Sequence, residues 1–315
     1  MIALDVVVVN WNAGDQLLER LQSLSLACQS SVFELSRCIV VDNASGDGSA
    51  DRLDQLALPL VVLRNLENTG FAHACNQGAK AGAAEYVLFL NPDVQLFSDS
   101  LEKALVFLAE PQNENVGIVG IQLTDENGVV QRNVARFPTP GALFSQMVGL
   151  DRLSPAHFPA LFMVEWDHRS SRAVDQVPGA FFLIRRHVFE KLHGFDERFF
   201  LYFEDLDLAW RARQAGFASY YLAEARAFHR GGGTTSQVKA QRLFYILRSR
   251  VQYVAKHFGR PAAVSIMLAS LAFEFWLRLA LSLIRFSVSS FVETAQAYGL
   301  FVRALPRLFA DLKAE

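Results

Sequence analysis

Short apolar runs alternate with polar loops and helical patterns through the first hundred residues. β-Branched and other apolar residues form runs at 4–9, 37–41, 60–63 and 86–90. A polar loop follows each run, and apolar residues at helical spacing follow the loops. Such strand–loop–helix units predict a parallel, doubly wound α/β sheet. One polar residue after each strand stands out: Asn10, Asp42, Asn68 and Asp93.

The stretch EYVLFLNPDV, residues 85–94, is the centre of this pattern. Its apolar part predicts a buried central strand, and Pro92 ends the hydrogen-bond ladder. Asn91 and Asp93 then lie at the carboxyl edge of the sheet, where open α/β sheets bind ligands. An Asp in a short loop there suits a magnesium-type ion that bridges phosphates. The alternative is an ordinary turn, since Asn, Pro and Asp are common turn residues.

Two other loops carry candidate nucleotide contacts. Asp42 follows the second strand and can accept a hydrogen bond from a ribose hydroxyl or a base N–H, or it can cap a turn. Gly70 permits close approach of the backbone to a ligand, or simply forms a turn. The sequence contains neither GxGxxG nor GxxxxGK[ST], so a dinucleotide fold or P-loop is not supported.

Further elements are predicted beyond residue 95. Helices are expected at 99–108 and 186–192, and strands at 116–123, 181–184 and 217–222. Asp99 and Glu102 have the spacing of a capping box, and Ser49 is placed to cap an earlier helix. Residues 135–176 contain four prolines and little periodicity, which is typical of a functional loop or lid.

Three acids at 204, 205 and 207 begin a predicted helix after an aromatic run. On a helix Glu204 and Asp207 share a face, whereas Asp205 points elsewhere. Acids in a first turn also favour the helix dipole, which is the structural alternative. A carboxylate in apolar surroundings has a raised pKa and can serve as general base. His229 precedes a glycine-rich loop at 231–235 and is either a ligand or a structural histidine.

Composition narrows the class of protein. The 315 residues include 30 Lys and Arg and 32 Asp and Glu, for a net charge of −2. This balance argues against a nucleic-acid binder, which usually has a basic excess. Three cysteines without metal-ligand spacing indicate free thiols in a reducing compartment. No basic segment precedes the first apolar run, so we expect no signal peptide.

The C-terminal part predicts helices. Residues 237–258 form a basic helix, and 262–284 are apolar except for a polar stripe that includes Glu274 and Arg278. Two central charges cost about 2.5–3.5 kcal/mol each in a bilayer. We therefore favour an in-plane helix at a membrane surface or a helix buried in an oligomer. The alternative is a helical extension that packs on its own sheet. A second amphipathic segment covers 291–312.

Seven stretches in order extend from about residue 8 to 235: VVNWN, IVVDNASGDGS, NTGFAHACNQG, VLFLNPDV, VPGAFFLIRR, GFDERFFLYFEDLDLAWRARQAG and FHRGGGTT. Together they resemble the inverting glycosyltransferases of family 2, which have the GT-A fold, and especially the bacterial rhamnosyltransferase-like group. The resemblance implies a GT-A catalytic domain at 1–236 and a helical extension at 237–315.

The resemblance also implies roles for individual residues. Asp93 would hold a divalent ion against the diphosphate, and His229 would be its second protein ligand. Asn91 replaces the first acid of the family's Asp-x-Asp motif, so only a neutral contact is available there. Asp205 would be the general base, with Glu204 beside it. The other implied contacts lie on the donor side (Asn10, Asp42, Asn68, Phe71, Asn76) and the acceptor side (Gly179, Ala180).

The implied function is transfer of rhamnose or another hexose to a hydroxyl of a saccharide or lipid-linked acceptor. The donor expected is a dTDP-sugar, with a UDP-sugar as the alternative, and the ion is Mg²⁺ or Mn²⁺. A nucleotidyltransferase is a competing hypothesis, but it needs a glycine-rich basic loop where this chain has VNWNAGD. A non-catalytic sugar-nucleotide binder is the third. We expect a cytoplasmic enzyme, peripheral at the inner face of the cell membrane or assembled as a homo-oligomer.

Overall fold

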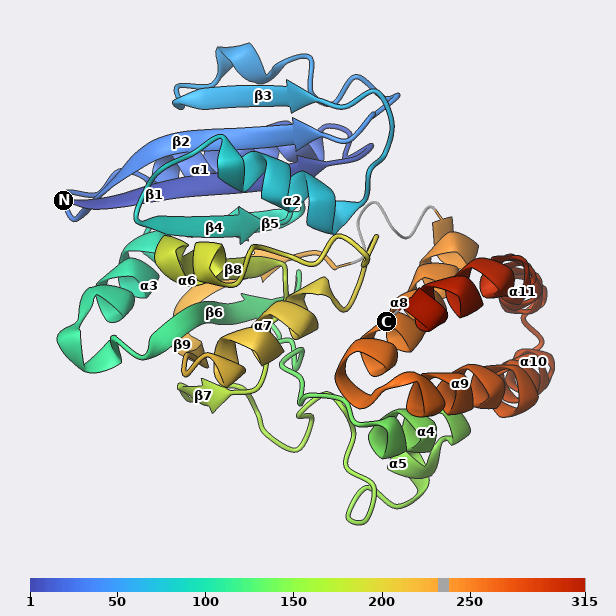
Figure 1. Cartoon of the computed structure of the whole chain (residues 1–315). Helices are drawn as coiled ribbons and strands as arrows, with labels where there is room; N and C mark the ends of the chain where they lie inside the picture. The colour runs from blue at the N-terminus through green and yellow to red at the C-terminus, as the bar shows by residue number, and fades with distance from the viewer. Residues whose placement is uncertain (232–237, 315) are drawn as a thin grey trace. The chain divides into compact units, whose positions relative to one another are not determined.

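The structure is a computed structural model that describes residues 1–231 and 238–314 (Figure 1). Its chain divides into two compact units. The first unit comprises Met1–Arg136, Phe162–Glu197 and Glu204–Thr234, and the second comprises Phe137–Leu161, Arg198–Phe203 and Thr235–Glu315. The expected boundary between residues 236 and 237, and residues 232–235 of the expected glycine-rich loop, lie outside the described residues.

A mixed sheet forms the first unit. Its strands run in the order β3 (Leu60–Arg64), β2 (Phe33–Asp42), β1 (Ile2–Asn10), β4 (Tyr86–Leu90), β8 (Phe181–Arg185), β6 (Val116–Thr124), β9 (Ala218–His229) and β5 (Val94–Leu96), with β7 (Arg172–Val174) paired to β9. The pairs β3–β2, β2–β1 and β1–β4 are parallel, as predicted. Strand β8 is antiparallel to both of its neighbours. The predicted α/β sheet is therefore confirmed, with antiparallel strands added after β4.

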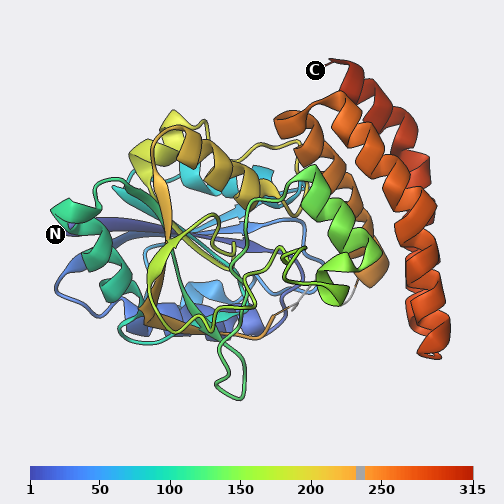
Figure 2. The same ribbon diagram turned by 90° about the horizontal axis from the view of Figure 1, so that it is seen from below.

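Helices cover both faces of the sheet (Figure 2). On one side lie α1 (Gln16–Ala27) and α3 (Ser100–Ala109), and on the other lie α2 (Phe71–Lys80), α6 (Arg186–Lys191) and α7 (Glu204–Gln214). Alternate side chains of β1 pack on the two faces of the sheet, because successive side chains of a strand point to opposite faces. Val6 and Val8 join Leu17 and Leu21 in the main core. Val7 faces α2, where a Cβ on Gly78 would lie only 2.4 Å from its Cγ1.

Three local expectations are wrong. Asp99 does not cap α3 through its side chain, and its carboxylate instead pairs with Lys103 one turn later at 2.6 Å. No α-helix follows Ser49; the chain forms a 3₁₀ turn at Leu53–Gln55. Residues 135–176 are not wholly irregular, because they contain α4 (Pro140–Val148), α5 (Leu150–Leu153) and β7.

The second unit is helical. Its long elements are α8 (Lys239–Phe258), α9 (Arg260–Ala269), α10 (Phe275–Ile284) and α11 (Val288–Ala314), and a π-turn at Ser270–Glu274 joins α9 to α10. The helix Arg260–Ile284 is thus continuous, and it is long and apolar enough to cross a membrane. Helix α11 packs against both α8 and α10. The predicted C-terminal helices are confirmed.

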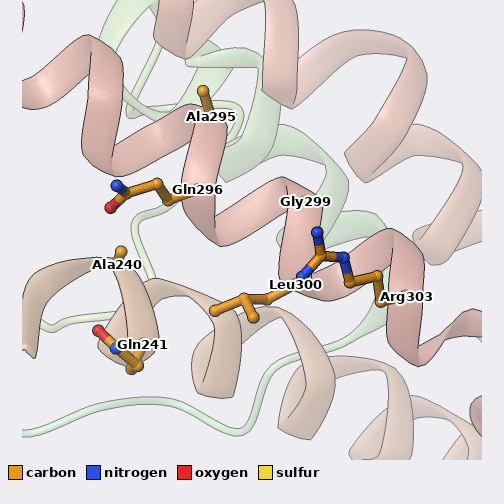
Figure 3. Close-up of a pocket in the computed structure, with 7 residues that line it drawn as sticks. All are labelled: Ala240, Gln241, Ala295, Gln296, Gly299, Leu300 and Arg303. Atoms are coloured by element: carbon orange, nitrogen blue, oxygen red, sulfur yellow. The ribbon is translucent and has the colours of Figure 1, made fainter.

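A groove lies between α8 and α11 (Figure 3). Its lining residues are Ala240, Gln241, Ala295, Gln296, Gly299, Leu300 and Arg303. None of the residues assigned to sugar transfer lines it.

Candidate functional site

Asn10 and Asp42 end two neighbouring parallel strands and meet at the sheet edge. They are partners in register, and Asn10 Nδ2 donates to Asp42 Oδ1 over 2.9 Å. The same nitrogen lies 3.0 Å from Ser45 Oγ and 2.8 Å from Ser49 Oγ in the loop after β2. Arg64 Nη1 lies 3.7 Å from the other oxygen of Asp42. The strands thus hold a buried carboxylate at the edge where nucleotide ligands bind in such folds.

Asn68 shapes the start of α2. Its Oδ1 accepts from Asn43 Nδ2 at 2.9 Å and from the Gly70 N–H at 3.0 Å. Gly70 has φ of +90° and immediately precedes Phe71, the first residue of α2. A side chain is strained at this φ, so the turn requires glycine. The first N–H groups of a helix have no partners within the helix, and they favour a negatively charged ligand.

Asn76 is engaged by protein groups. Its Nδ2 donates to the Phe195 carbonyl at 2.8 Å and to Glu197 Oε1 at 2.9 Å. Its Oδ1 accepts from the Phe195 N–H at 2.9 Å. These contacts join α2 to the loop after α6. The donor contact assigned to Asn76 stays a prediction, and the observed role of its amide is to hold this loop.

The Asn91-Pro92-Asp93 segment is a turn as well as a candidate ligand site. The Val94 N–H donates to the Asn91 carbonyl at 3.2 Å, and the Asn91 N–H donates to the Ala180 carbonyl at 3.0 Å. The turn directs the chain from β4 into β5, which pairs antiparallel with the end of β9. Val94 faces His229 in this pairing. Two residues far apart in the sequence, Asp93 and His229, thereby come together.

Gln131 orients the ring of His229. Its Nε2 donates to the His229 carbonyl at 2.7 Å, which turns Oε1 towards His229 Nδ1 at 3.1 Å. Nδ1 must then carry the proton, so Nε2 of the neutral ring presents a lone pair. That atom lies 3.4 Å from Asp93 Oδ1. An imidazole nitrogen and a carboxylate oxygen so placed fit a shared divalent ion.

Asp205 sits in a cradle of hydrogen-bond donors. Its Oδ2 accepts from Gln176 Nε2 at 2.8 Å and from the Gly179 N–H at 3.1 Å. Its Oδ1 accepts from the Leu206 N–H at 2.8 Å. The residue is half-buried. Burial raises the pKa of Asp205, and these hydrogen bonds oppose the rise.

Glu204 has different surroundings from Asp205. It is buried, and within the described part of the chain its Oε2 has no hydrogen-bond partner. Burial holds the pKa of Glu204 well above its ordinary value, and the charges of Asp205 and Asp207 add to the rise. Asp205 is therefore partly exposed, whereas Glu204 is buried.

Asp207 has a structural contact. Its Oδ2 accepts from Arg211 Nε at 2.7 Å, one turn later in α7. Arg211 also donates to the carbonyls of Leu192 and Gly194 at 2.5 and 2.9 Å. The prediction that Asp205 points away from the face shared by Glu204 and Asp207 agrees with these partners.

The aromatic run before α7 belongs to the second unit, within the segment Arg198–Phe203. Phe200 stacks there on Tyr245 with 4.6 Å between ring centroids. Tyr202 and Phe203 both have positive φ, +67° and +70°. Side chains rarely adopt this region, so the backbone entering α7 is strained.

Sequence reasoning missed two residues that hold the site, Gln131 and Gln176. Neither follows a predicted strand or belongs to a charged cluster. Their roles depend on partners 98 and 29 residues away. No local pattern reports such distant pairings.

Comparison with known proteins identifies the family of the chain. The family model described as "Glycosyltransferase like family 2" matches residues 3–251. An N-acetylglucosaminyl-diphospho-decaprenol L-rhamnosyltransferase of Mycobacterium tuberculosis is 30% identical over 270 residues, which cover 81% of this chain and 85% of the relative. The rhamnosyltransferase WbbL of Escherichia coli is 25% identical over 173 residues, covering 55% and 62% of the two chains.

Solved structures share the fold. The mannosyltransferase PcManGT of Pyrobaculum calidifontis, in complex with GDP-Man and Mn²⁺, matches with a TM-score of 0.53 and 18% identity, over 99% of this chain and 80% of that one. S. aureus TarS 1–349 with UDP-GlcNAc gives a TM-score of 0.53 and 18% identity, over 98% and 83%. Both are similar in fold to this chain, and the GT-A fold class is confirmed.

Proposed function

We propose, from the premise that this chain belongs to glycosyltransferase family 2, that it transfers rhamnose from dTDP-rhamnose to a hydroxyl of a lipid-linked saccharide. The family and the glycosyltransferase activity follow from the family match and the 30% identical relative. The choice of sugar and acceptor rests on that relative, which is named for L-rhamnose transfer and for N-acetylglucosaminyl-diphospho-decaprenol. A UDP-hexose is the alternative donor.

The observation that carries the mechanism is the cradle around Asp205. A general base needs a carboxylate that a substrate hydroxyl can reach and a fixed orientation. Asp205 is half-buried and held by Gln176 and the Gly179 backbone. We assign Asp205 the role of removing the proton from the acceptor hydroxyl. The acceptor oxygen then attacks the anomeric carbon in one displacement, which expels the nucleoside diphosphate and inverts the configuration at that carbon. Glu204 is too buried to meet the acceptor, and we assign it a supporting role.

Asp93 and His229 are the residues we assign to the divalent ion. No group of three or more His, Cys, Asp or Glu side chains within the described ranges is arranged to hold a metal. Two protein ligands together with substrate phosphates are nevertheless the usual environment of Mg²⁺. When bound, the ion neutralises charge that develops on the departing diphosphate. Gln131 fixes the imidazole of His229 for this purpose.

The nucleotide end of the donor is assigned to Asp42, which Asn10 orients at the carboxyl ends of β1 and β2. Asn68 and Phe71 lie at the start of α2, where helix N–H groups suit a diphosphate. Asn91 follows β4 in the same sheet edge. We assign Gly179 and Ala180 to the acceptor side, because the Gly179 N–H donates to Asp205 and a Cβ at Gly179 would lie 3.3 Å from Asp205 Oδ2.

We place the reaction in the cytoplasm, at the inner face of the membrane. The thiols of Cys28, Cys38 and Cys75 are free, which suits a reducing compartment. A lipid-linked acceptor would require access to a bilayer.

The test is a donor screen with the full chain. Calorimetric titration with dTDP-, UDP- and GDP-sugars, in Mg²⁺, Mn²⁺ or chelator, should show metal-dependent binding strongest for dTDP-rhamnose. Transfer to a polyprenyl-diphospho-N-acetylglucosamine analogue should then release dTDP. Donor binding without transfer to any acceptor would indicate a non-catalytic binder. Release of pyrophosphate from a nucleoside triphosphate and a sugar phosphate would instead indicate a nucleotidyltransferase.

A further inference from the structure

The helix Arg260–Ile284 has its polar residues on the buried side. Ser270, Glu274 and Ser282 are all buried. Glu274 accepts from Arg250 Nη2 at 2.5 Å and from Arg278 Nη2 at 2.8 Å. The Arg250 partner comes from α8, so the polar stripe faces the inside of the helical unit. This arrangement is the reverse of an ordinary surface helix, which buries its apolar side.

Large apolar side chains cover the opposite side of the same helix and its C-terminal end. Six of them are more than half exposed: Leu268, Phe273, Trp276, Leu283, Ile284 and Phe286. We call these six residues the apolar face. Soluble monomers rarely expose so many large apolar side chains on one helix, and exposed apolar patches commonly mark contact with a membrane or a protein.

Basic residues accompany the apolar face. Residues 239–315 contain eleven Lys and Arg against four Asp and Glu, in a chain whose net charge is −2. Two of the four acids are paired with two of these basic residues, Glu274 with Arg250 and Glu293 with Lys239, so nine basic residues remain against two acids. Arg260 and Arg285 are exposed at the two ends of the helix. A basic surface beside an apolar one is complementary to anionic lipid headgroups.

We propose that the apolar face lies on an anionic phospholipid bilayer, with the helix Arg260–Ile284 parallel to the membrane surface. Phe273 and Trp276 would enter the boundary between headgroups and acyl chains, where aromatic residues are favoured. The surrounding arginines would contact lipid phosphates. This inference rests on the helical unit alone and does not depend on which sugar is transferred.

The charged residues of this helix, buried Glu274 and exposed Arg278, argue against a membrane-spanning position. Spanning would carry Glu274 and Arg278 to the middle of the bilayer and separate Glu274 from its partner on α8.

An interface between two copies of the chain is also disfavoured. It would bring two sets of basic residues together, and like charges across an interface repel. An anionic bilayer offers acyl chains to the apolar face and phosphates to the basic residues.

Vesicle sedimentation of the full chain tests the proposal. The wild type should pellet with phosphatidylcholine vesicles that contain phosphatidylglycerol, and much less with pure phosphatidylcholine or at high salt. The double variant Phe273→Glu with Trp276→Glu should lose affinity by at least about tenfold, because it removes two large apolar contacts. Leu26→Glu is the matched control: Leu26 is equally exposed, near the end of α1 in the first unit. It should bind as the wild type does.

A depth measurement separates the binding modes. Brominated lipids quench nearby tryptophan, and Trp276 is one of four tryptophans in the chain. Bromine near the headgroups should quench the wild type, and Trp276→Phe should lose this quenching while still folding and binding vesicles. Strongest quenching by bromine at the bilayer centre would overturn the in-plane arrangement.

Three other outcomes would overturn the proposal. Equal sedimentation of the double variant and the wild type would exclude the apolar face as the contact. Failure of the wild type to bind any vesicle would exclude the bilayer. If a wild-type dimer in lipid-free buffer became monomeric in the double variant, the apolar face would be an interface between copies. Circular dichroism of each variant verifies that the fold is retained. None of these measurements requires sugar transfer, so they stand apart from the test of the proposed activity.

Discussion

Asp205 and Glu204 are neighbours in the chain, but their carboxylates meet different surroundings. Asp205 is half-buried and accepts three hydrogen bonds from Gln176, Gly179 and Leu206. Glu204 is buried beside two other acids. Access and orientation, more than the identity of the carboxylate, therefore separate a candidate base from a supporting residue.

Asp205→Asn should lose about 10²–10⁴-fold in transfer rate while keeping donor affinity, because an amide keeps the shape but cannot take a proton. Initial rates and donor titration on the same protein measure both quantities. Glu204→Gln is the matched control and should be milder. Near-normal transfer by Asp205→Asn together with an inactive Glu204→Gln would move the base to Glu204. Lost donor affinity in Asp205→Asn would place Asp205 among the donor or metal contacts.

Gln176→Met should shift the acid limb of the pH–rate profile to higher pH. The Gln176 amide donates to the ionised carboxylate of Asp205 and so favours it. Removing that donor raises the pKa of Asp205, and the base is then protonated over a wider range. A full profile of kcat against pH measures this, and a merely structural loss would lower the rate equally at all pH values. An unshifted acid limb would exclude Gln176 as a positioning residue.

At the scale of elements, the β5–β9 pair builds the candidate metal site. The turn after β4 carries Asp93 to the end of β9, and Gln131 holds His229 from the segment after β6. The local turn preferences of Asn91-Pro92-Asp93 and the ligand interpretation are therefore compatible. The turn is what places the carboxylate.

Asp93→Ala should abolish the metal dependence of donor binding. Gln131→Met should weaken metal affinity by about 10–100-fold, because loss of a residue that orients a metal ligand typically has an effect of this size. Donor titrations across a range of Mg²⁺ and Mn²⁺ concentrations compare the two. Arg132→Met, at the neighbouring residue whose guanidinium donates to Val164, is the matched control. Unchanged metal dependence in Asp93→Ala would show that the metal assignment is wrong.

Several elements were predictable and others were not. Periodicity located β1 to β4 and the C-terminal helices. Helix α4 was not predicted, because its single short segment has weak periodicity. Signals for its two ends are nevertheless present in the sequence. Thr139 Oγ1 accepts from the Ala142 N–H, Pro140 is the first residue, and Gly149 ends the helix with φ of +77°. The capping box at α3 failed because Asp99 pairs with Lys103.

For the molecule as a whole, the buried acids link stability to pH. The pKa of Glu204 in the folded state lies above its ordinary value of 4.5. Between these two pKa values the folded protein binds a proton that the unfolded chain has lost. The free energy of unfolding must therefore fall as pH rises through this window.

Glu204→Gln should reduce the decrease of the free energy of unfolding with rising pH, because the amide of glutamine does not ionise. Its melting temperature relative to wild type should rise as the pH increases above about 4.5, until the pH passes the raised pKa of Glu204. Thermal unfolding at several pH values measures the difference. Glu190→Gln, which changes an exposed glutamate in the same unit, is the control and should leave the pH dependence unchanged. A constant difference between Glu204→Gln and wild type would contradict the raised pKa.

The sequence by itself determined the α/β class, the polar positions after each strand and the helical C-terminal region, because strand and helix periodicities and turn residues are local properties of the chain. It also contained the motifs of the family. Only the tertiary structure decided which side chains meet. Asp93 reaches His229, Asp205 reaches Gln176, and Glu274 reaches Arg250 across many residues of sequence. Such pairings depend on strand order and helix packing, which arise from burial of the whole chain.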